Sequence, residues 1–170
     1  MKSTTKSILS KLSIGALCLL VLALMATPAS AYTNTATTTM AVSATVQATC
    51  TVTAGAMSFG TYNTAVNNST ATITTTCTNT TPYQIGLDKG ANGGSVTTRQ
   101  MKNGAALLNY SLTQDAGHAT NWGNTPGTDT PAAVNGNGSG QTVTVYGQIP
   151  AGQYVTPGSY SDTITVTVNY

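Results

Sequence analysis

The protein has 170 residues, of which six are basic and four acidic, so charged side chains make up only 6% of the chain. This length leaves room for one ordinary domain, and the charged share is far below the usual value of about a quarter of residues. So few cations provide neither the basic surface that nucleic acid requires nor a polybasic patch for an anionic membrane. We therefore expect no nucleic-acid partner.

The first 31 residues have the features of a secretory signal peptide. Three lysines precede an apolar run at residues 12–26, which is too short to span a membrane comfortably, and a small-residue cleavage motif occupies residues 29–31. We expect cleavage after Ala31, export, and no membrane insertion of the mature chain; an uncleaved anchor is the alternative. Three basic residues and four aspartates would remain, which gives the mature chain a net charge of −1.

Cys50 and Cys77 are the two cysteines of the expected mature chain. An even pair in an exported chain predicts a disulfide, which would stabilise the fold by about 3.5 kcal/mol in the chain-entropy model. A metal or redox site is the weaker alternative, because no histidine lies nearby and the two cysteines are not spaced as in a C-x-x-C motif.

Residues 36–50 alternate between mostly apolar and mostly polar side chains. This period of two predicts a half-buried β-strand that is far longer than the usual length of about 5–6 residues. Such a strand is either the first strand of a self-complete sandwich or a segment that also serves a second sheet. The mostly apolar face consists of Ala36, Thr38, Met40, Val42, Ala44, Val46, Ala48 and Cys50.

Short strand-like segments separated by turn residues follow this stretch. They cover residues 56–63, 69–77, 82–88, 108–114, 142–149 and 160–170. Ile73 and Cys77 share one face, which points the sulfur inward, and Gly147 is a candidate for a β-bulge. No helical period of useful length occurs after the signal, so the chain is expected to be all-β, an antiparallel sandwich or barrel.

The long loop at residues 115–140 is of a kind that is often functional or mobile. Its Trp122 could stack on a sugar ring or could close the core under the loop. The stretch at residues 135–140 has no carboxylate, so we interpret it as a flexible turn rather than a calcium site.

Groups for catalysis are few. His118 is the only histidine and lies in the loop without an evident nucleophile, and the chain has no glutamate. Asp88 and Asp115 follow strand-like segments, where aspartate commonly makes local turn hydrogen bonds. The sequence therefore predicts no enzyme, no catalytic residue, no cofactor and no metal site, against the alternative of a carboxylate pair for glycosyl transfer.

Several motifs together resemble the spore coat protein U domain family, which includes secreted subunits of archaic, Csu-type chaperone–usher pili. The resemblance covers residues 41–170. The motifs are "CTV" at 50–52, "FGTYN" at 59–63, "TCTNTTPYQIGLDKG" at 76–90, "RQM" at 99–101, "NYSLTQD" at 109–115, "WG" at 122–123, "VYGQIPAGQ" at 145–153 and "GSYSDTITVTVNY" at 158–170.

This resemblance implies an incomplete immunoglobulin-like antiparallel β-sandwich that lacks its last strand and is completed by a donor strand from a neighbouring subunit. Residues 32–46 would be the donor extension and residues 47–170 the pilin domain. The inward side chains of the donor would be Thr38, Met40, Val42, Ala44 and Val46. The groove edge on the terminal strand would carry Tyr160, Ile164, Val166, Val168 and Tyr170.

The partners implied by the resemblance are a periplasmic chaperone, an outer-membrane usher and other copies or related pilus subunits. The expected function is that of a structural subunit, in the periplasm in transit and then in a surface pilus that supports adhesion and biofilm formation. A secreted or spore-coat structural protein is the first alternative. A carbohydrate-binding module is the second.

Overall fold

The computed structural model describes residues 34–170, so the expected signal peptide and its cleavage site lie outside the described residues. The chain divides into two units, Met1–Ala44 and Thr45–Tyr170. In the first unit, residues 34–44 form no strand and are exposed to solvent.

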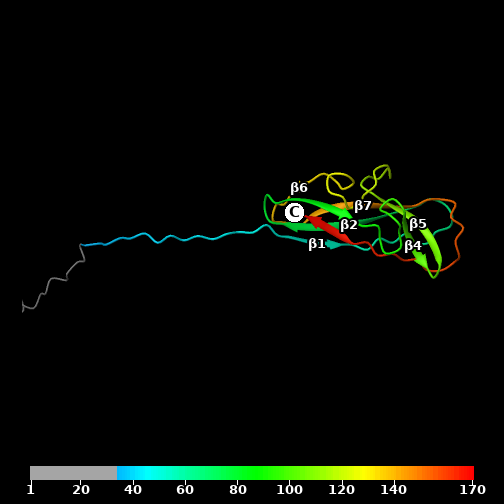
Figure 1. The fold of residues 1–170 in the computed structure, drawn as a ribbon, viewed down its shortest axis with the longest axis horizontal. Helices are drawn as coiled ribbons and strands as arrows, with labels where there is room; N and C mark the ends of the chain where they lie inside the picture. The colour runs from blue at the N-terminus through cyan, green and yellow to red at the C-terminus, as the bar shows by residue number, and fades with distance from the viewer. Residues whose placement is uncertain (1–33) are drawn as a thin grey trace, which may run out of the picture. The chain divides into compact units, whose positions relative to one another are not determined.

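The second unit is built from eight β-strands (Figure 1), and the described residues include no helix. The strands are β1 (Cys50–Ala54), β2 (Asn67–Cys77), β3 (Pro82–Leu87), β4 (Arg99–Asn103), β5 (Ala106–Thr113), β6 (Val134–Asn135), β7 (Gln141–Ile149) and β8 (Val166–Asn169). No helix in residues 34–170 is long and apolar enough to cross a membrane.

The strands form two antiparallel sheets, one with the order β1-β2-β7-β5-β4 and the other with the order β6-β3-β8. Side chains from both sheets meet in one apolar core, which makes the unit a β-sandwich. The buried core residues are Ile73, Cys77, Tyr83, Ile85, Leu87, Leu108, Tyr110, Leu112, Trp122, Val145 and Ile149. The strands predicted at residues 69–77, 82–88, 108–114 and 142–149 are confirmed as β2, β3, β5 and β7.

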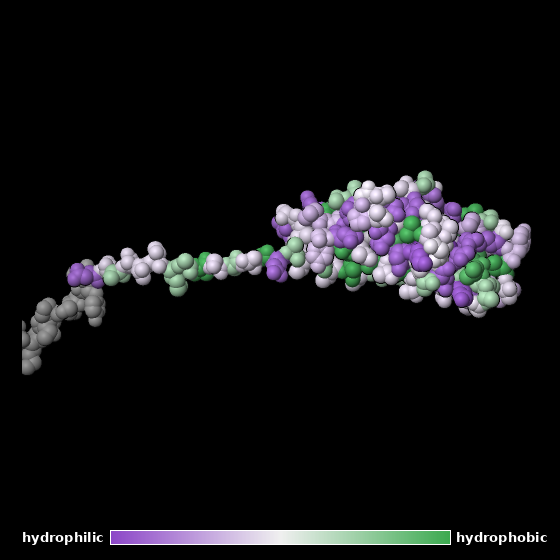
Figure 2. All heavy atoms as spheres, in the orientation of Figure 1, coloured by the Kyte–Doolittle hydropathy of each residue, from purple (hydrophilic) through white to green (hydrophobic). Residues whose placement is uncertain are grey.

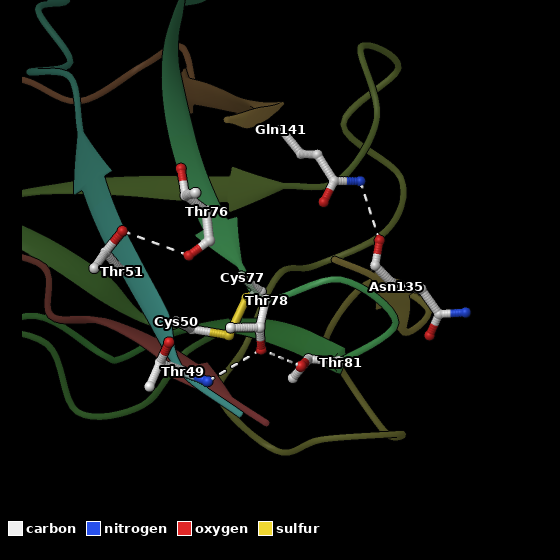
Figure 3. Close-up of a disulfide and its surroundings, with 9 residues drawn as sticks. All are labelled: Thr49, Cys50, Thr51, Thr76, Cys77, Thr78, Thr81, Asn135 and Gln141. Atoms are coloured by element: carbon white, nitrogen blue, oxygen red, sulfur yellow. Dashed lines mark hydrogen bonds between the residues drawn. A yellow bond between two sulfur atoms is a disulfide. The ribbon is translucent and has the colours of Figure 1, made fainter. Parts of the chain in front are cut away.

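A disulfide between Cys50 and Cys77 joins β1 to β2, as the two cysteines predicted (Figure 3). The residues on either side extend the pairing. The Thr78 amide donates to the Thr49 carbonyl oxygen at 2.9 Å, and the Thr49 amide donates to Thr78 Oγ1 at 3.2 Å. The chain is thus fixed in an extended conformation at the point where it enters the sandwich.

The prediction that residues 36–50 form one long strand is wrong within a single chain. Residues 34–49 are outside every strand, and pairing begins only at Cys50, opposite Cys77. Alternating side chains indicate what a strand would bury, but a strand also needs a partner edge for its backbone hydrogen bonds.

The prediction of a strand at residues 56–63 is also wrong. This segment is irregular, and side chains rather than a strand ladder hold its carbonyl groups. Asn67 Nδ2 donates to the Phe59 oxygen at 2.8 Å, and Ser69 Oγ donates to the Ser58 oxygen at 2.6 Å.

Gly147 does not form a bulge, because β7 runs in unbroken register with β2 through the Ser69–Gly147 pair. The glycine instead leaves room for side chains that cross β7. A Cβ atom at this position would collide with Met57 Sδ and come within 2.9 Å of the Phe59 ring.

Two further strand boundaries differ from expectation. The terminal strand is limited to β8, because residues 160–165 make only an isolated bridge, between Ser161 and Lys102. β4 was not foreseen as a strand, because its sequence RQMKN has no apolar alternation. A two-residue turn that begins with Gly104, at a φ of 56°, joins it to β5.

We predict that Thr75→Val stabilises the protein by about 1 kcal/mol. Thr75 is fully buried on the inner face of β2, and its hydroxyl has no hydrogen-bond partner among residues 34–170. A valine of similar shape removes this cost, and thermal unfolding should show a midpoint raised by a few degrees. The control Thr72→Val, at an exposed position of the same strand, should change the midpoint little. A lower midpoint for Thr75→Val would contradict this interpretation of the buried hydroxyl.

Candidate functional site

An open groove follows the line where the two sheets meet at β1 and β8. Two adjoining cavities, of about 740 Å³ and about 510 Å³, share Met57, Phe59, Met101 and Tyr160, and together they make up the groove. Residues 54–62, which include the end of β1 and the segment after it, form the first wall. Residues 153–166, which lead into β8, form the second wall.

The floor of the groove is the apolar core itself. Ile73, Leu87, Leu112 and Val145 line it, although each is at most 4% exposed. The large apolar side chains of the walls are only partly buried against that core: Met57, Phe59 and Tyr62 from the first wall, and Val155, Tyr160, Ile164 and Val166 from the second. The side chains that cover the core along this line are therefore more exposed to solvent than the core residues beneath them.

Each wall adjoins a strand that has one edge without a pairing partner. Within residues 34–170, β1 pairs only with β2, and β8 pairs only with β3. Unpaired strand edges beside apolar side chains can accept an extended peptide, which adds backbone hydrogen bonds along the edge and places alternate side chains in the groove.

Two carboxylates hold the second wall in place where it lacks strand pairing. Asp162 Oδ2 accepts from the Tyr110 hydroxyl at 2.7 Å, and its Oδ1 accepts from the Ala91 amide at 2.9 Å and from Asn92 Nδ2 at 3.0 Å. Burial, and then the bond to Asp162, raises the pKa of Tyr110 well above its ordinary value. The phenol therefore stays a proton donor in the groove floor.

Asp88 fixes the same wall closer to β8. Its Oδ1 accepts from the amides of Gly90 and Thr165, both at 2.9 Å. Burial raises the pKa of Asp88, but the bonds from Thr165 and Gly90, together with the Arg99 charge, outweigh this effect, and the pKa lies below its ordinary value. The ionised carboxylate is therefore the form that holds the wall.

Arg99 is a supporting residue that the sequence did not reveal as such. It is fully buried, and it donates to the carbonyl oxygens of Leu87 at 2.9 Å, Asp88 at 2.8 Å and Trp122 at 2.7 Å. It thus ties β3, β4 and the long loop together behind the groove. A buried arginine interrupts apolar alternation instead of creating a pattern, so the motif "RQM" was its only sequence signal.

The structure brings some of the predicted groove-edge residues together and leaves others apart. Tyr160, Ile164 and Val166 line the groove. Val168 packs against the core from β8, whereas Tyr170 is exposed.

The side chains predicted for a donor strand are exposed to solvent. Met40, Val42 and Val46 have 84%, 83% and 86% of their surfaces accessible, and Thr38 and Ala44 are also exposed. Single exposed apolar residues are common. An alternating set of them in a segment without secondary structure is more unusual, and it marks a surface that a partner could cover.

The sugar-binding interpretation of Trp122 is wrong. Its side chain is fully buried, and its Nε1 donates to the Ile85 carbonyl oxygen at 2.8 Å, so the ring is not available for stacking on a ligand. The long loop is part of the sandwich: the Trp122 amide donates to the Leu112 oxygen, and the Leu87 amide donates to the Gly123 oxygen. The carbohydrate-binding hypothesis loses its sequence basis.

The polar groups of the loop serve local structure. His118 Nδ1 lies 3.1 Å from Thr113 Oγ1, a partner that the sequence did not indicate. The Asp115 carboxylate accepts from the amides of Ala119 and Thr120, and these bonds lower its pKa. Within residues 34–170 no group of three or more His, Cys, Asp or Glu side chains is arranged to hold a metal ion.

Figure 2 shows that hydrophilic and neutral side chains dominate the face in view and that hydrophobic ones gather in separate patches.

Comparison with known proteins identifies the family. Residues 36–167 match the family model of the Spore Coat Protein U domain. The chain belongs to this family. It is 34% identical over 155 residues to Protein U of Myxococcus xanthus, an alignment that covers 80% of this chain and 86% of that protein.

A solved structure supports the fold. The chain is similar, with a TM-score of 0.51 and 23% identity, to a chain in the crystal structure of the CsuC–CsuE chaperone–tip adhesion subunit pre-assembly complex from archaic chaperone–usher Csu pili of Acinetobacter baumannii. The match covers 74% of this chain and 40% of that chain. It confirms the expected fold class, and at this identity the likeness extends to the fold alone.

We predict that acid weakens the second wall through Asp88. Because the folded-state pKa of Asp88 lies below its ordinary value of 3.8, the stabilisation is fully present above that value and is lost as the pH falls through the lower, folded-state pKa. Asp88→Asn should lower the thermal midpoint at neutral pH and make it depend less on pH below about pH 5.

Amide hydrogen exchange locates this effect. Asp88→Asn should speed exchange at Thr165, whereas the control Asp115→Asn should act at Ala119 and Thr120 instead. If Asp88→Asn has the same acid dependence as the unchanged protein, another group holds the wall.

Proposed function

We propose that the protein is an exported structural subunit that polymerises into a surface pilus by donor-strand complementation. The observation that carries this proposal is the groove between the segment that follows β1 and the segment that precedes β8. This groove opens onto the core, and within residues 34–170 both β1 and β8 have one unpaired edge. In the polymer, residues 38–46 of one subunit lie in the groove of the next and complete its sandwich.

The donor segment and the groove agree in chemistry. The inward face of the donor carries no charge, and the groove floor is apolar. At roughly 1.5–3 kcal/mol for each large apolar side chain, burial of Met40, Val42 and Val46 would contribute about 5–8 kcal/mol before ordering costs. Ala44 adds little, which limits the strength of the joint.

A chaperone is the partner that the subunit needs before assembly. An apolar groove with free strand edges is prone to aggregation unless it is covered. In the similar Csu structure, a chaperone and a tip adhesion subunit form a pre-assembly complex. By analogy, this subunit meets a periplasmic chaperone after removal of residues 1–31, and an outer-membrane usher then exchanges the chaperone for the donor segment of another subunit. The resulting pilus supports adhesion and biofilm formation.

A secreted or spore-coat structural protein is the second candidate, favoured by the family description and by the uncharged surface rich in threonine. Negative-stain microscopy of producing cells, with and without this protein, distinguishes the two. Thin surface fibres that vanish with the protein support the pilus, and a continuous layer that vanishes supports the coat.

We predict that a synthetic peptide of residues 32–46 stabilises a chain that begins at Gln47. The peptide fills the groove of the folded state, so the thermal midpoint should rise with peptide concentration. The control is the same peptide with Met40 and Val42 replaced by aspartate, which should have no effect because it would bury unpaired charges. A truncated chain that ignores the unchanged peptide would show that the groove is not a donor site.

We further predict that Met40→Asp blocks fibre growth and leaves a folded subunit. The side chain is exposed before assembly, and the carboxylate becomes buried only when the segment enters a neighbouring groove. Thr39→Asp is the matched control on the opposite face of the segment and should be much milder. Fibre yield and the thermal midpoint of the isolated subunit should be measured together. The proposal fails if Met40→Asp unfolds the isolated subunit as a core substitution would.

A further inference from the structure

We propose that Met57 and Met101 form an oxidation site in the groove, at which a peroxide converts both thioethers to sulfoxides and closes the groove to an apolar occupant. This inference rests on the proposed function for the identity of the occupant. The oxidation itself depends only on where the two side chains lie.

The reduced sulfur of the described chain lies in the groove and on the proposed donor segment. Residues 34–170 contain three methionines, and their two cysteines are joined in a disulfide. Met40 is on the donor segment and is 84% exposed. Met57 and Met101 line both cavities of the groove. These thioethers are therefore the groups that a mild oxidant would modify in this part of the chain.

Met57 and Met101 reach the groove from different segments. Met57 belongs to the irregular stretch after β1, and a Cβ atom at Gly147 would collide with its Sδ, so the sulfur lies against the backbone of β7. Met101 is on β4, opposite Leu108. Both methionines are only partly buried against the core, and the cavities that they line measure about 740 Å³ and about 510 Å³. A molecule as small as hydrogen peroxide can therefore reach both side chains.

The reaction balances with the thioether and hydrogen peroxide alone. The sulfur attacks one peroxide oxygen, and an S–O bond forms as the O–O bond breaks. The displaced hydroxide takes the proton of the new S–OH group and leaves as water. The sulfur loses the two electrons that the peroxide gains, and a flexible apolar side chain becomes a polar sulfoxide.

The sulfoxide oxygens need hydrogen-bond donors that the tyrosines around the groove do not supply. Three tyrosine hydroxyls of the groove already donate to acceptors within the chain: those of Tyr62, Tyr110 and Tyr160. Water can satisfy the sulfoxides while the groove is empty. An apolar occupant excludes that water and leaves the oxygens buried without a partner, which is unfavourable. Oxidation therefore weakens binding of the occupant more than it disturbs the open subunit.

Peptide binding before and after oxidation tests this inference. The full mature chain with Met40→Leu, diluted until it is monomeric by light scattering, is treated with hydrogen peroxide, which is then removed. Mass spectrometry should show one added oxygen on Met57 and one on Met101. The Kd for a labelled peptide of residues 32–46 should rise by about tenfold or more. An unchanged Kd in the doubly oxidised chain, or intact Met57 and Met101, would overturn the inference.

Thermal unfolding separates closure of the groove from damage to the fold. The oxidised chain should still unfold cooperatively, and methionine sulfoxide reductases, which reverse the modification, should return its Kd to within about twofold of the starting value. A treated chain that has lost cooperative unfolding would be damaged as a whole, and the inference would be wrong.

The matched control carries Met57→Leu and Met101→Leu in addition to Met40→Leu, because leucine has a similar volume and no thioether. Each protein is compared with itself. The Kd of the control after treatment should stay within about twofold of its own value before treatment. If the control loses affinity as the methionine form does, groups other than the two thioethers respond to the oxidant, which contradicts the inference.

Protection by the occupant gives a second test. In the unchanged mature chain, a saturating peptide that carries Met40→Leu should slow the oxidation of Met57 and Met101 by about tenfold or more. The rate at the chain's own exposed Met40 is the internal control and should stay the same. Equal rates at Met57 and Met101 with and without bound peptide would show that the occupant does not cover them and would overturn the inference.

Failure of the donor-strand proposal gives a different result. A chain that ignores the peptide before treatment overturns that proposal, and binding of the apolar dye anilinonaphthalene sulfonate then tests the oxidation site by itself. Dye fluorescence should fall severalfold when Met57 and Met101 are oxidised and should not fall in the leucine control. Dye fluorescence that is unchanged by oxidation would overturn the inference.

Discussion

The central constraint on this protein is an apolar core that is open along one line. Ile73, Leu87 and Leu112 are as buried as core residues elsewhere, yet they also form the floor of a groove between the segments that adjoin β1 and β8. Hydrophobic burial stabilises a sandwich only as far as its sheets exclude water. Under the donor-strand proposal, a strand added along this line would exclude more water from the core and would couple folding to assembly.

An open groove must keep its shape while it is empty, and polar contacts provide that support. The second wall has no strand ladder between residues 160 and 165, so Asp88 and Asp162 hold it through backbone amides. Arg99 fixes the neighbouring carbonyl groups from the inside. These bonds hold the walls without a strand between them. Under the donor-strand proposal, walls held in this way would lower the ordering cost of an incoming segment.

The sequence predicted the strands correctly where the alternation of apolar and polar side chains alone determined them. Alternation predicted the strands β2, β3, β5 and β7, whose apolar side chains point into the core at every second position. It failed at residues 56–63 and 160–165, whose apolar side chains pack on the core without a strand partner beside them. β4 was missed because its inward residue is Arg99. For the candidate site, the resemblance placed Tyr160, Ile164 and Val166 on the groove edge, whereas the side-chain hydrogen bonds that hold the walls leave no periodic signal.

The opening stretch is the most informative of these cases. A strand pattern over residues 36–50 that forms no strand until Cys50 conflicts with the general agreement between local pattern and fold. If the pattern were incidental, exposed Met40, Val42 and Val46 would be an aggregation hazard without benefit. An intermolecular strand removes the conflict, because the pattern then matches the groove of another molecule. The small side chain of Ala44 fits the same proposal, because a segment that is exchanged between molecules does not need the tightest packing.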